Sequence, residues 1–333
     1  MSNSSPVRVG LNGFGRIGRS VLRAARGDDR IEIVAINDVM DDEEMEYLAR
    51  YDSVHGGQDV ELRDGAFRVD GRDIPVLSES DPTALPWDDY DVDVAFEATG
   101  IFRTYDEVHQ HVEAGAEKAL ISAPPKGEKD VFTMVYGVNH DEYSGEDVLS
   151  NASCTTNSVA PAAMVLDEAF GIESGLLTTV HSYTGSQNLM DGPNSKPRRR
   201  RAAAENIIPT STGAAQSTTQ VLPELEGKLD GMAMRVPTPN GSITDLTVSL
   251  EADPSKEELN EAFYEAATGE LEGVLGVTDE AVVSRDIVGE PYSSLVDLDA
   301  NQSLEGGLKK VLAWYDNEYG FANRMLDAAA YVN

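Results

Sequence analysis

The sequence has 333 residues, of which 41% are hydrophobic, enough to bury a sizeable core, and two domains are expected at this length. Its 59 acidic residues outnumber the 26 basic ones, and the formal net charge is −33. This balance disfavours a nucleic-acid partner, because a phosphate backbone needs a basic protein face. The sequence also lacks a run of about 18 uncharged apolar residues, so it predicts no membrane span.

The first residues and the cysteine content bear on the cellular compartment. Residues 1–7 contain no basic start followed by an apolar run, so we expect no ordinary secretory signal and a cytoplasmic protein. Cys154 is the only cysteine, which excludes an intrachain disulfide and any metal site built from several cysteines.

The acidity itself predicts adaptation to salt. Periodic apolar segments argue against disorder as its explanation. Electrostatic repulsion on this scale is tolerable in strong salt, because the Debye length falls from about 10 Å at 0.1 M salt to about 3 Å at 1 M. We therefore expect a salt-rich cytoplasm and a halophilic protein, and the alternative is an ordinary acidic protein.

A glycine motif opens the chain. Apolar residues 7–12 predict a strand, and Gly-Phe-Gly-Arg-Ile-Gly at 13–18 leads into a helix with apolar residues at helical spacing. In a dinucleotide-binding loop, Gly13 forms the tight turn, Gly15 lets the backbone approach a pyrophosphate, and Gly18 lets the helix pack on the strand. The N–H groups of the helix N-terminus then bind the anion. Alone, such a motif also arises by chance or as a structural turn.

The following strands strengthen the prediction of a nucleotide site. Residues 31–36 predict a second strand, and Asp38 lies 20 residues after Gly18, where an acidic residue binds the ribose hydroxyls. A carboxylate there repels a 2′-phosphate, which favours NAD over NADP. Strands predicted at 92–96 and 119–121 also end in small residues, as the floor of a nucleotide crevice does.

Cys154 is predicted to lie in the first turn of a helix. A strand over 147–152 leads into Ser-Cys-Thr-Thr-Asn at 153–157, and apolar residues recur at helical spacing as far as Phe170. A helix N-terminus or a nearby cation can lower a thiol pKa from about 8.5 to roughly 3.5–7.5, which predicts a thiolate. The alternative is a buried structural cysteine, which the polar neighbours of Cys154 disfavour.

A nucleophilic cysteine needs a base, and His181 is the candidate. It lies in a predicted strand over 176–184, whereas His109 and His111 sit among charged residues of a predicted helix. The residues alone leave open that His181 is an ordinary strand histidine.

An irregular segment over 183–203 ends in four consecutive arginines, Arg198 to Arg201. A basic run is usually a solvated face, but in so acidic a chain we expect these arginines to hold a specific anion or a subunit contact. Hydroxyl groups at 210–212 and the guanidinium of Arg235 supply the directional donors that suit a phosphate ester.

The rest of the chain does not alternate between strands and helices. Its strands, with one clear helix among them at 257–267, are predicted at 232–237, 243–250, 294–298 and 308–315. This pattern favours a largely antiparallel sheet with helices on one face. A last helix is predicted at 321–331.

The sequence motifs together resemble phosphorylating glyceraldehyde-3-phosphate dehydrogenase, in the form found in bacteria and eukaryotes. The match is ordered along nearly the whole chain, and its motifs lie at 13–18, 153–157, 181–184, 206–209, 211–215, 234–239 and 314–318. The resemblance implies an α/β Rossmann-type dinucleotide-binding domain over 1–153 and an α+β catalytic domain with a mainly antiparallel sheet over 154–317. The C-terminal helix, at 318–333, is expected to pack back on the first domain.

The resemblance also implies roles for individual residues. Cys154 resembles the family's nucleophile and His181 its base. The implied NAD-binding residues are Gly13, Gly15, Arg16, Ile17, Gly18, Asp38, Thr99, Gly100, Ser122 and Asn317. The implied ligands of the substrate's C3 phosphate are Thr184 and Arg235, and those of inorganic phosphate are Ser153, Thr155, Thr212 and Gly213. Between the two anions the family places an arginine, which is Arg198 here or, if the loop is shifted by one residue, Arg199.

The implied reaction is the NAD-dependent oxidation of glyceraldehyde 3-phosphate through a cysteine thioester, which inorganic phosphate then attacks. The family is a cytosolic homotetramer of glycolysis. Two alternatives stay open on the sequence. One is an erythrose-4-phosphate dehydrogenase, whose thioester is hydrolysed without phosphate, and the other is a catalytically silent NAD-binding protein. Departures from the family pattern occur at Ser80, which falls beside the adenine, and at 185–188 and 194–197 in the loop between subunits.

Overall fold

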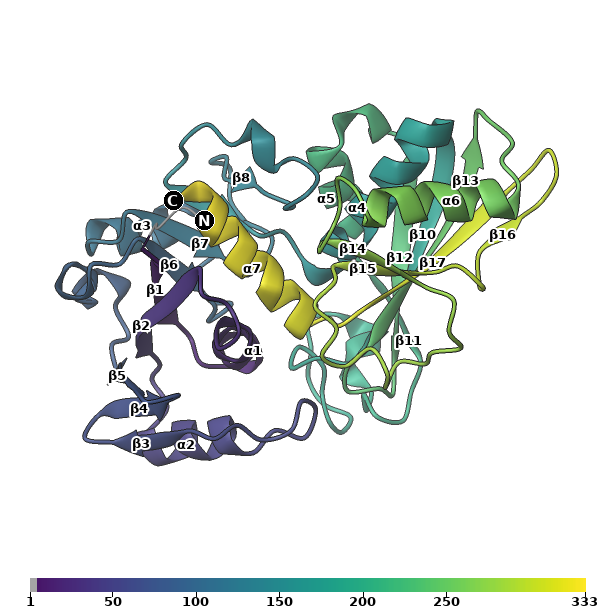
Figure 1. The fold of residues 1–333 in the computed structure, drawn as a ribbon. Helices are drawn as coiled ribbons and strands as arrows, with labels where there is room; N and C mark the ends of the chain where they lie inside the picture. Colours follow the sequence, from purple (N-terminus) through teal and green to yellow (C-terminus); the bar gives the residue numbers. More distant parts are fainter. Residues whose placement is uncertain (1–4) are drawn as a thin grey trace. The chain divides into compact units, whose positions relative to one another are not determined.

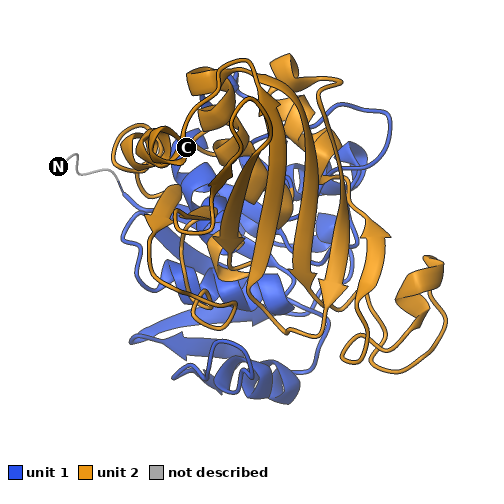
Figure 2. Ribbon diagram, turned by 90° about the vertical axis from the view of Figure 1, so that its right-hand side faces the viewer, with its two compact units in different colours: residues 1–134, 140–152, 322–333 blue, residues 135–139, 153–321 orange. Residues whose placement is uncertain are grey.

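A computed structural model describes residues 5–333 (Figure 1). Residues 1–4, which belong to the first predicted domain and to the segment considered for a secretory signal, lie outside the described part. The chain divides into two compact units, coloured separately in Figure 2. Unit 1 comprises residues 1–134, 140–152 and 322–333, and unit 2 comprises residues 135–139 and 153–321. Within residues 5–333, no helix is long and apolar enough to cross a membrane.

Unit 1 is built on a nine-stranded sheet in the order β3-β4-β5-β2-β1-β6-β7-β9-β8. Its strands are β1 (Val7–Asn12), β2 (Ile31–Asn37), β3 (Glu61–Arg63), β4 (Ala66–Val69), β5 (Arg72–Leu77), β6 (Val94–Glu97), β7 (Lys118–Ile121), β8 (Phe132–Thr133) and β9 (Val148–Ser150). The pairs β1–β2, β1–β6, β6–β7 and β7–β9 are all parallel. This arrangement confirms the predicted Rossmann-type sheet, because all its central strands end at one edge.

Among residues 5–333, four α-helices belong to unit 1, and the last of them starts in unit 2. They are α1 (Arg16–Ala25), α2 (Asp42–Arg50), α3 (Tyr105–Glu113) and α7 (Tyr319–Val332). Thr104 caps α3 with a capping box, in which its hydroxyl accepts from Glu107 N–H while the Glu107 carboxylate accepts from Thr104 N–H. Asp327 of α7 forms an ion pair with Arg30 at 2.7 Å, which attaches this helix to the rest of unit 1.

The sequence did not predict the antiparallel strands β3, β4 and β5. They are joined by two Asp-Gly turns, at 64–65 and 70–71, in which all four residues have positive φ. Such turns match the twist of a tight hairpin. β5 then pairs in parallel with β2 and so extends the nucleotide sheet.

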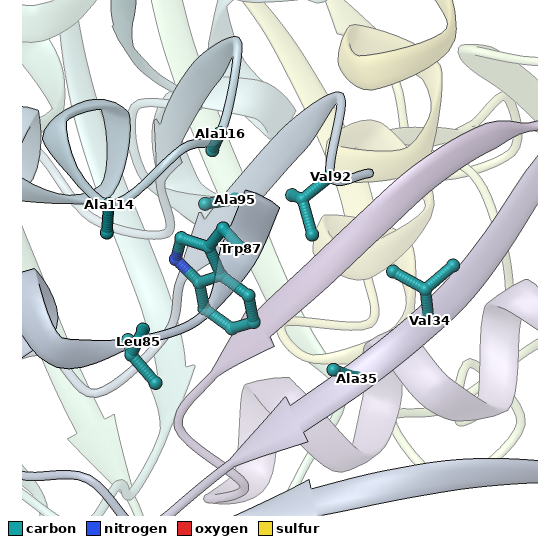
Figure 3. Close-up of a cluster of buried hydrophobic side chains, with 8 residues drawn as sticks. All are labelled: Val34, Ala35, Leu85, Trp87, Val92, Ala95, Ala114 and Ala116. Carbon is teal, nitrogen blue, oxygen red and sulfur yellow. The ribbon is translucent and has the colours of Figure 1, made fainter. Parts of the chain in front are cut away.

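A buried cluster around Trp87 supports the centre of this sheet (Figure 3). The indole lies in a 3-10 turn over Trp87–Tyr90, and a Cβ on Gly10 of β1 would lie only 2.9 Å from its ring. Its Nε1–H donates to His111 Nδ1 at 3.1 Å. Since an indole can only donate, the imidazole proton must be on Nε2, which faces Glu97 Oε2 at 3.2 Å.

Glu97, at the end of β6, is fully buried and accepts hydrogen bonds at both oxygens. Oε2 accepts from Asn12 Nδ2 at 2.6 Å and from His111, and Oε1 accepts from the backbone N–H and the hydroxyl of Thr99. Asn12 in turn accepts from Asn37 Nδ2 at 2.7 Å. This polar network therefore connects the ends of β1, β2 and β6 below the predicted nucleotide site.

Unit 2 contains an eight-stranded sheet in the order β11-β12-β10-β13-β17-β15-β14, with β16 beside β17. Its strands are β10 (Ile172–Ser182), β11 (Ile208–Ser211), β12 (Leu229–Val236), β13 (Ser242–Leu250), β14 (Leu275–Thr278), β15 (Ser294–Asp297), β16 (Gln302–Ser303) and β17 (Lys309–Tyr315). Pairs β10–β12 and β14–β15 are parallel and the others antiparallel. The mainly antiparallel sheet was predicted correctly.

Helices cover one face of this sheet. They are α4 (Cys154–Phe170), α5 (Ala214–Val221) and α6 (Lys256–Ala267), and α4 packs against both other helices and against β13, β15 and β17. The opposite face lies in front in Figure 2, where the strands of unit 2 are in full view. On that face the strand register aligns Met234, Val180, Ile243 and Trp314 in one row, each of them half-buried.

Candidate active site

The glycine loop of unit 1 has the backbone geometry that a dinucleotide requires. Gly13 has φ of 100°, and a Cβ there would lie 2.6 Å from Thr99 N. A Cβ on Gly18 would meet Gly13 O at 2.1 Å, so only glycine lets α1 pack this closely on the loop. Gly15 is the N-cap of α1 and provides no side-chain cap. No atom lies within 4 Å of the position that a Cβ would occupy there. The N-terminus of α1 is thus open to an anion, and these residues fit a pyrophosphate.

Asp38 follows β2 and faces this loop. Its Oδ2 accepts from Phe14 N at 2.6 Å, and its Oδ1 accepts from Met40 N at 3.0 Å. The carboxylate is only partly buried, so it remains accessible beside the loop. A carboxylate fixed in this way offers its oxygens to ribose hydroxyls.

The other predicted cofactor residues of unit 1 lie at strand ends or at the start of α1. Thr99 is held by Glu97, Gly100 follows it with φ of 72°, and Ser122 donates its N–H to Glu97 O at 2.9 Å. Ile17 is in the first turn of α1, as is Arg16, whose Nη1 lies 2.5 Å from Asp52 Oδ2. The carboxyl pKa of Asp52 is lowered to about 2, because hydrogen bonds from His55 and Val54 N–H and from Arg16 outweigh the opposing effect of burial.

Cys154 occupies the first position of α4, as predicted. Ser153 is the N-cap, and its hydroxyl accepts from Thr156 N at 3.0 Å. The Sγ of Cys154 lies 3.5 Å from Nε2 of His181, the residue before Ser182, which ends β10. The structure therefore brings the predicted nucleophile and base together within unit 2.

The hydrogen bonds of His181 identify its role in proton transfer. Its Nδ1 lies 2.7 Å from Ser182 O and 2.9 Å from Arg235 Nη1; with the proton on Nδ1 and donated to Ser182 O, Nε2 is free to accept from the thiol. Burial and the charge of Arg235 lower the pKa of His181 to about 3, so the imidazole is neutral at ordinary pH. It can therefore act as a base.

Burial also raises the pKa of the Cys154 thiol, while Arg235 and the Thr155 hydroxyl oppose this rise. This environment works against the strongly acidified thiol that the sequence predicts. The raised pKa of the thiol and the lowered pKa of the imidazole favour a neutral thiol facing a neutral imidazole. Proton transfer from Sγ to Nε2 is then part of the chemical step.

Arg235 lies beside this pair, at the end of β12. Its Nη1 donates to Ser182 O at 2.9 Å and lies 2.9 Å from His181 Nδ1, because β12 pairs in parallel with β10 and sets Arg235 opposite His181. Burial lowers the pKa of this guanidinium, and its Nε is buried without a hydrogen-bond partner. Within residues 5–333 no carboxylate is bonded to Arg235, which leaves an anion as its natural ligand.

The irregular segment after β10 adds a second guanidinium. Arg199 donates through Nη1 to Ser186 Oγ at 3.1 Å and through Nε to Thr210 Oγ1 at 3.2 Å. Ser186 also contacts the predicted phosphate ligand Thr184, hydroxyl to hydroxyl, at 2.9 Å. Arg199 lowers the pKa of His181, which places its charge near the catalytic pair. Of the two arginines considered for the position between the anions, Arg199 is the one with these contacts; Arg198 is exposed.

The remaining predicted phosphate ligands lie at helix N-termini or nearby. Thr155, in the first turn of α4, contacts the Tyr315 hydroxyl at 3.0 Å. The Thr212 hydroxyl accepts from Ala214 N at 3.1 Å. Gly213 is the N-cap of α5, and the space that a Cβ would enter there is open. The helix N-terminus formed by Thr212 and Gly213 is therefore also open to an anion.

Asn317, predicted at the nicotinamide, is 5% exposed and follows β17. Its Oδ1 accepts from the hydroxyls of Ser182 at 2.8 Å and Ser242 at 2.9 Å, which fixes the amide orientation. Ser182, Ser242 and Tyr315 were not among the site residues predicted from the sequence. Tyr315 lies edge-on to His181, with ring centroids 5.9 Å apart, and burial raises the pKa of its hydroxyl.

Comparison with known families gives the same assignment as the motifs. The glyceraldehyde 3-phosphate dehydrogenase NAD binding domain matches residues 7–105, and the C-terminal domain of the same enzyme matches residues 153–317. The chain belongs to the glyceraldehyde-3-phosphate dehydrogenase family. This confirms the family, the fold class and the dinucleotide cofactor, NAD, that the sequence predicts.

Relatives of this family cover the whole chain. Glyceraldehyde-3-phosphate dehydrogenase of Haloarcula vallismortis is 67% identical over 332 residues, which is 99% of each chain. Glyceraldehyde-3-phosphate dehydrogenase 1 of Bacillus subtilis (strain 168) is 51% identical over 330 residues, 98% of each chain. The enzyme of Geobacillus stearothermophilus is 50% identical over the same share. These names do not favour the erythrose-4-phosphate alternative.

Proposed function

We propose that the protein oxidises D-glyceraldehyde 3-phosphate with NAD and phosphate to 1,3-bisphosphoglycerate, through a hemithioacetal and a thioester on Cys154. The observation that carries this proposal is the 3.5 Å contact between Cys154 Sγ and His181 Nε2, beside a guanidinium that has no carboxylate partner among the described residues. A nucleophile and base next to an anion site suit an aldehyde that carries a phosphate.

Unit 1 supplies the cofactor site in this proposal. Gly13, Gly15 and Gly18 admit the pyrophosphate at the N-terminus of α1, and Asp38 binds the adenosine ribose. The further residues assigned to NAD are Arg16, Ile17, Thr99, Gly100, Ser122 and, from unit 2, Asn317. When bound, NAD supplies the hydride acceptor.

Cys154 and His181 carry the bond changes. As Sγ bonds to the aldehyde carbon, the thiol proton passes to His181 Nε2 and on to the carbonyl oxygen, giving the hemithioacetal. His181 then takes the hydroxyl proton as hydride leaves, and the thioester forms. An oxygen of inorganic phosphate attacks the thioester carbon, and the sulfur leaves as the acyl phosphate is released.

Two anion sites serve the two phosphates. Thr184 and Arg235 bind the C3 phosphate of the substrate, because Arg235 lies against His181 and Thr184 follows it closely in the chain. Ser153, Thr155, Thr212 and Gly213 bind inorganic phosphate at the starts of α4 and α5. Arg199 acts between them, in place of Arg198.

The decisive experiment measures initial rates with glyceraldehyde 3-phosphate, with and without inorganic phosphate, using NAD or NADP. We expect turnover that requires phosphate and prefers NAD. Sustained turnover without phosphate, with erythrose 4-phosphate as the better substrate, would refute the proposal. A protein that binds NAD but turns over neither substrate would be catalytically silent.

We also propose that the protein is a cytoplasmic homotetramer adapted to high salt. The uncovered face of the unit 2 sheet carries the half-buried row Met234, Val180, Ile243 and Trp314, which suits contact with a second copy. With −33 charges per chain, low salt leaves repulsion between copies unscreened. Size-exclusion chromatography across a KCl series should show dissociation and loss of activity in dilute buffer. A tetramer that stays active there for days would contradict the adaptation.

A further inference from the structure

A lysine joins the two arginines of the anion site in unit 2. Lys196 lies in the segment that also carries Arg199, and the charges of both Arg199 and Arg235 act on it. Burial lowers the pKa of Lys196, and these two arginines lower it further. Three cations have thus gathered in a chain whose net charge is −33, and within residues 5–333 none of the three is bonded to a carboxylate.

The local backbone explains why Lys196 and Arg199 act together. Lys196 is the N-cap of a 3-10 turn over Pro197–Arg200, and its carbonyl accepts from Arg199 N at 3.0 Å. The two side chains also donate to neighbouring residues of β11, Lys196 to the hydroxyl of Ser211 and Arg199 to that of Thr210. The next two arginines are engaged elsewhere. Arg200 donates to Asn194 O at 2.9 Å, and Arg201 pairs with Asp191 at 2.8 Å.

The contact of Lys196 indicates which anion it serves. Its Nζ donates to Ser211 Oγ at 3.0 Å, and Ser211 immediately precedes Thr212 and Gly213 at the start of α5. Those two residues belong to the proposed inorganic phosphate site. The C3 phosphate site, by contrast, is assigned to Thr184 and Arg235. The lysine therefore lies against the site of the attacking phosphate.

We propose that Lys196 binds the inorganic phosphate that attacks the thioester, an assignment that rests on the proposed function. The ammonium group is a compact charge with three donors, so it can hold Ser211 and a phosphate oxygen at once. The bound anion also relieves the repulsion among Lys196, Arg199 and Arg235. Without it, these cations oppose one another.

The test compares Lys196→Met and Lys196→Gln with the charge-preserving Lys196→Arg, in the full-length enzyme. A charge contact at an exposed lysine predicts a KM for phosphate about fivefold higher in Lys196→Met and Lys196→Gln, with Lys196→Arg close to wild type. The KM for glyceraldehyde 3-phosphate should stay unchanged. The effect should shrink as KCl rises, because salt screens the contact.

Arg201→Met provides the matched control, since it removes one positive charge from the same segment at a residue already paired with Asp191. An equal rise in the KM for phosphate in Arg201→Met would show an effect of net charge and overturn the assignment. So would an unchanged KM for phosphate in Lys196→Met, or a rise in the KM for glyceraldehyde 3-phosphate instead. Failure of the proposed function would appear separately, as wild-type turnover that needs no phosphate.

Discussion

Replacement of His111 by leucine tests the buried network that holds the nucleotide end of unit 1. His111 is fully buried, accepts from Trp87 Nε1 and donates to Glu97. Leucine is close to histidine in volume but can neither accept nor donate a hydrogen bond. The variant therefore leaves an indole N–H without an acceptor and removes one of the donors to a buried carboxylate.

The expected loss follows from these two contacts. An unsatisfied buried donor costs about 1–3 kcal/mol, and a hydrogen bond to a charged group contributes about 1.5–3 kcal/mol. His111→Leu should therefore lower the free energy of unfolding by roughly 2.5–6 kcal/mol. His111→Gln, which offers an acceptor to Trp87 and a donor to Glu97, should recover at least half of that loss.

The assay is urea denaturation followed by circular dichroism, at one protein concentration and in high KCl, because the proposed assembly would contribute to apparent stability. Trp87→Phe removes the unpaired donor, so the double variant with His111→Leu should lose less stability than the sum of the single variants. If His111→Leu unfolded within about 0.5 kcal/mol of wild type, or if His111→Gln were equally damaged, the hydrogen-bond reasoning would be refuted.

Three further predictions concern single side chains. Cys154→Ser should abolish oxidation while NAD binding, measured by equilibrium dialysis, persists; steady-state turnover by this variant would contradict the thioester. Asp38→Ala should raise kcat/KM for NADP relative to NAD, since it removes the repulsion of a 2′-phosphate; an unchanged ratio would show that Asp38 does not discriminate. Asp52 has a folded pKa of about 2, below its ordinary value of 3.8, so its stabilising effect is present above about pH 4 and is lost as the pH falls toward 2. Asp52→Asn should flatten the dependence of the urea midpoint on pH in that range. A slope equal to that of wild type would contradict the stabilising role of ionised Asp52.

The central strands and the glycine loop of unit 1 were predictable because their signals are local. Buried parallel strands are nearly continuous apolar runs, and β1, β2, β6 and β7 have this character. The turns at 64–65 and 70–71 carried an equally local signal, since Asp-Gly between short strands marks a hairpin. The strands themselves are too short to show a clear alternation of apolar residues, and that hairpin signal was missed.

The active site depended more on contacts distant in sequence. That Cys154 meets His181 follows from how α4 packs on the sheet, and Arg235 reaches the pair only because β12 lies in parallel beside β10. No local sequence pattern indicates either of these contacts. The choice of Arg199 over Arg198 depends on one 3-10 turn, and the raised pKa of Cys154 depends on burial that no sequence motif reports.

The two tryptophans give the molecule an optical reporter in each unit. Trp87 is fully enclosed in unit 1 with its N–H fixed on His111, whereas Trp314 lies on the uncovered sheet face of unit 2 with its N–H on Asp297. Indole emission shifts to longer wavelength as water reaches the ring. If the proposed tetramer separates, only the Trp314 component should therefore shift, whereas unfolding should shift both. Fluorescence of the two single-tryptophan variants can then distinguish loss of assembly from loss of fold along a salt titration.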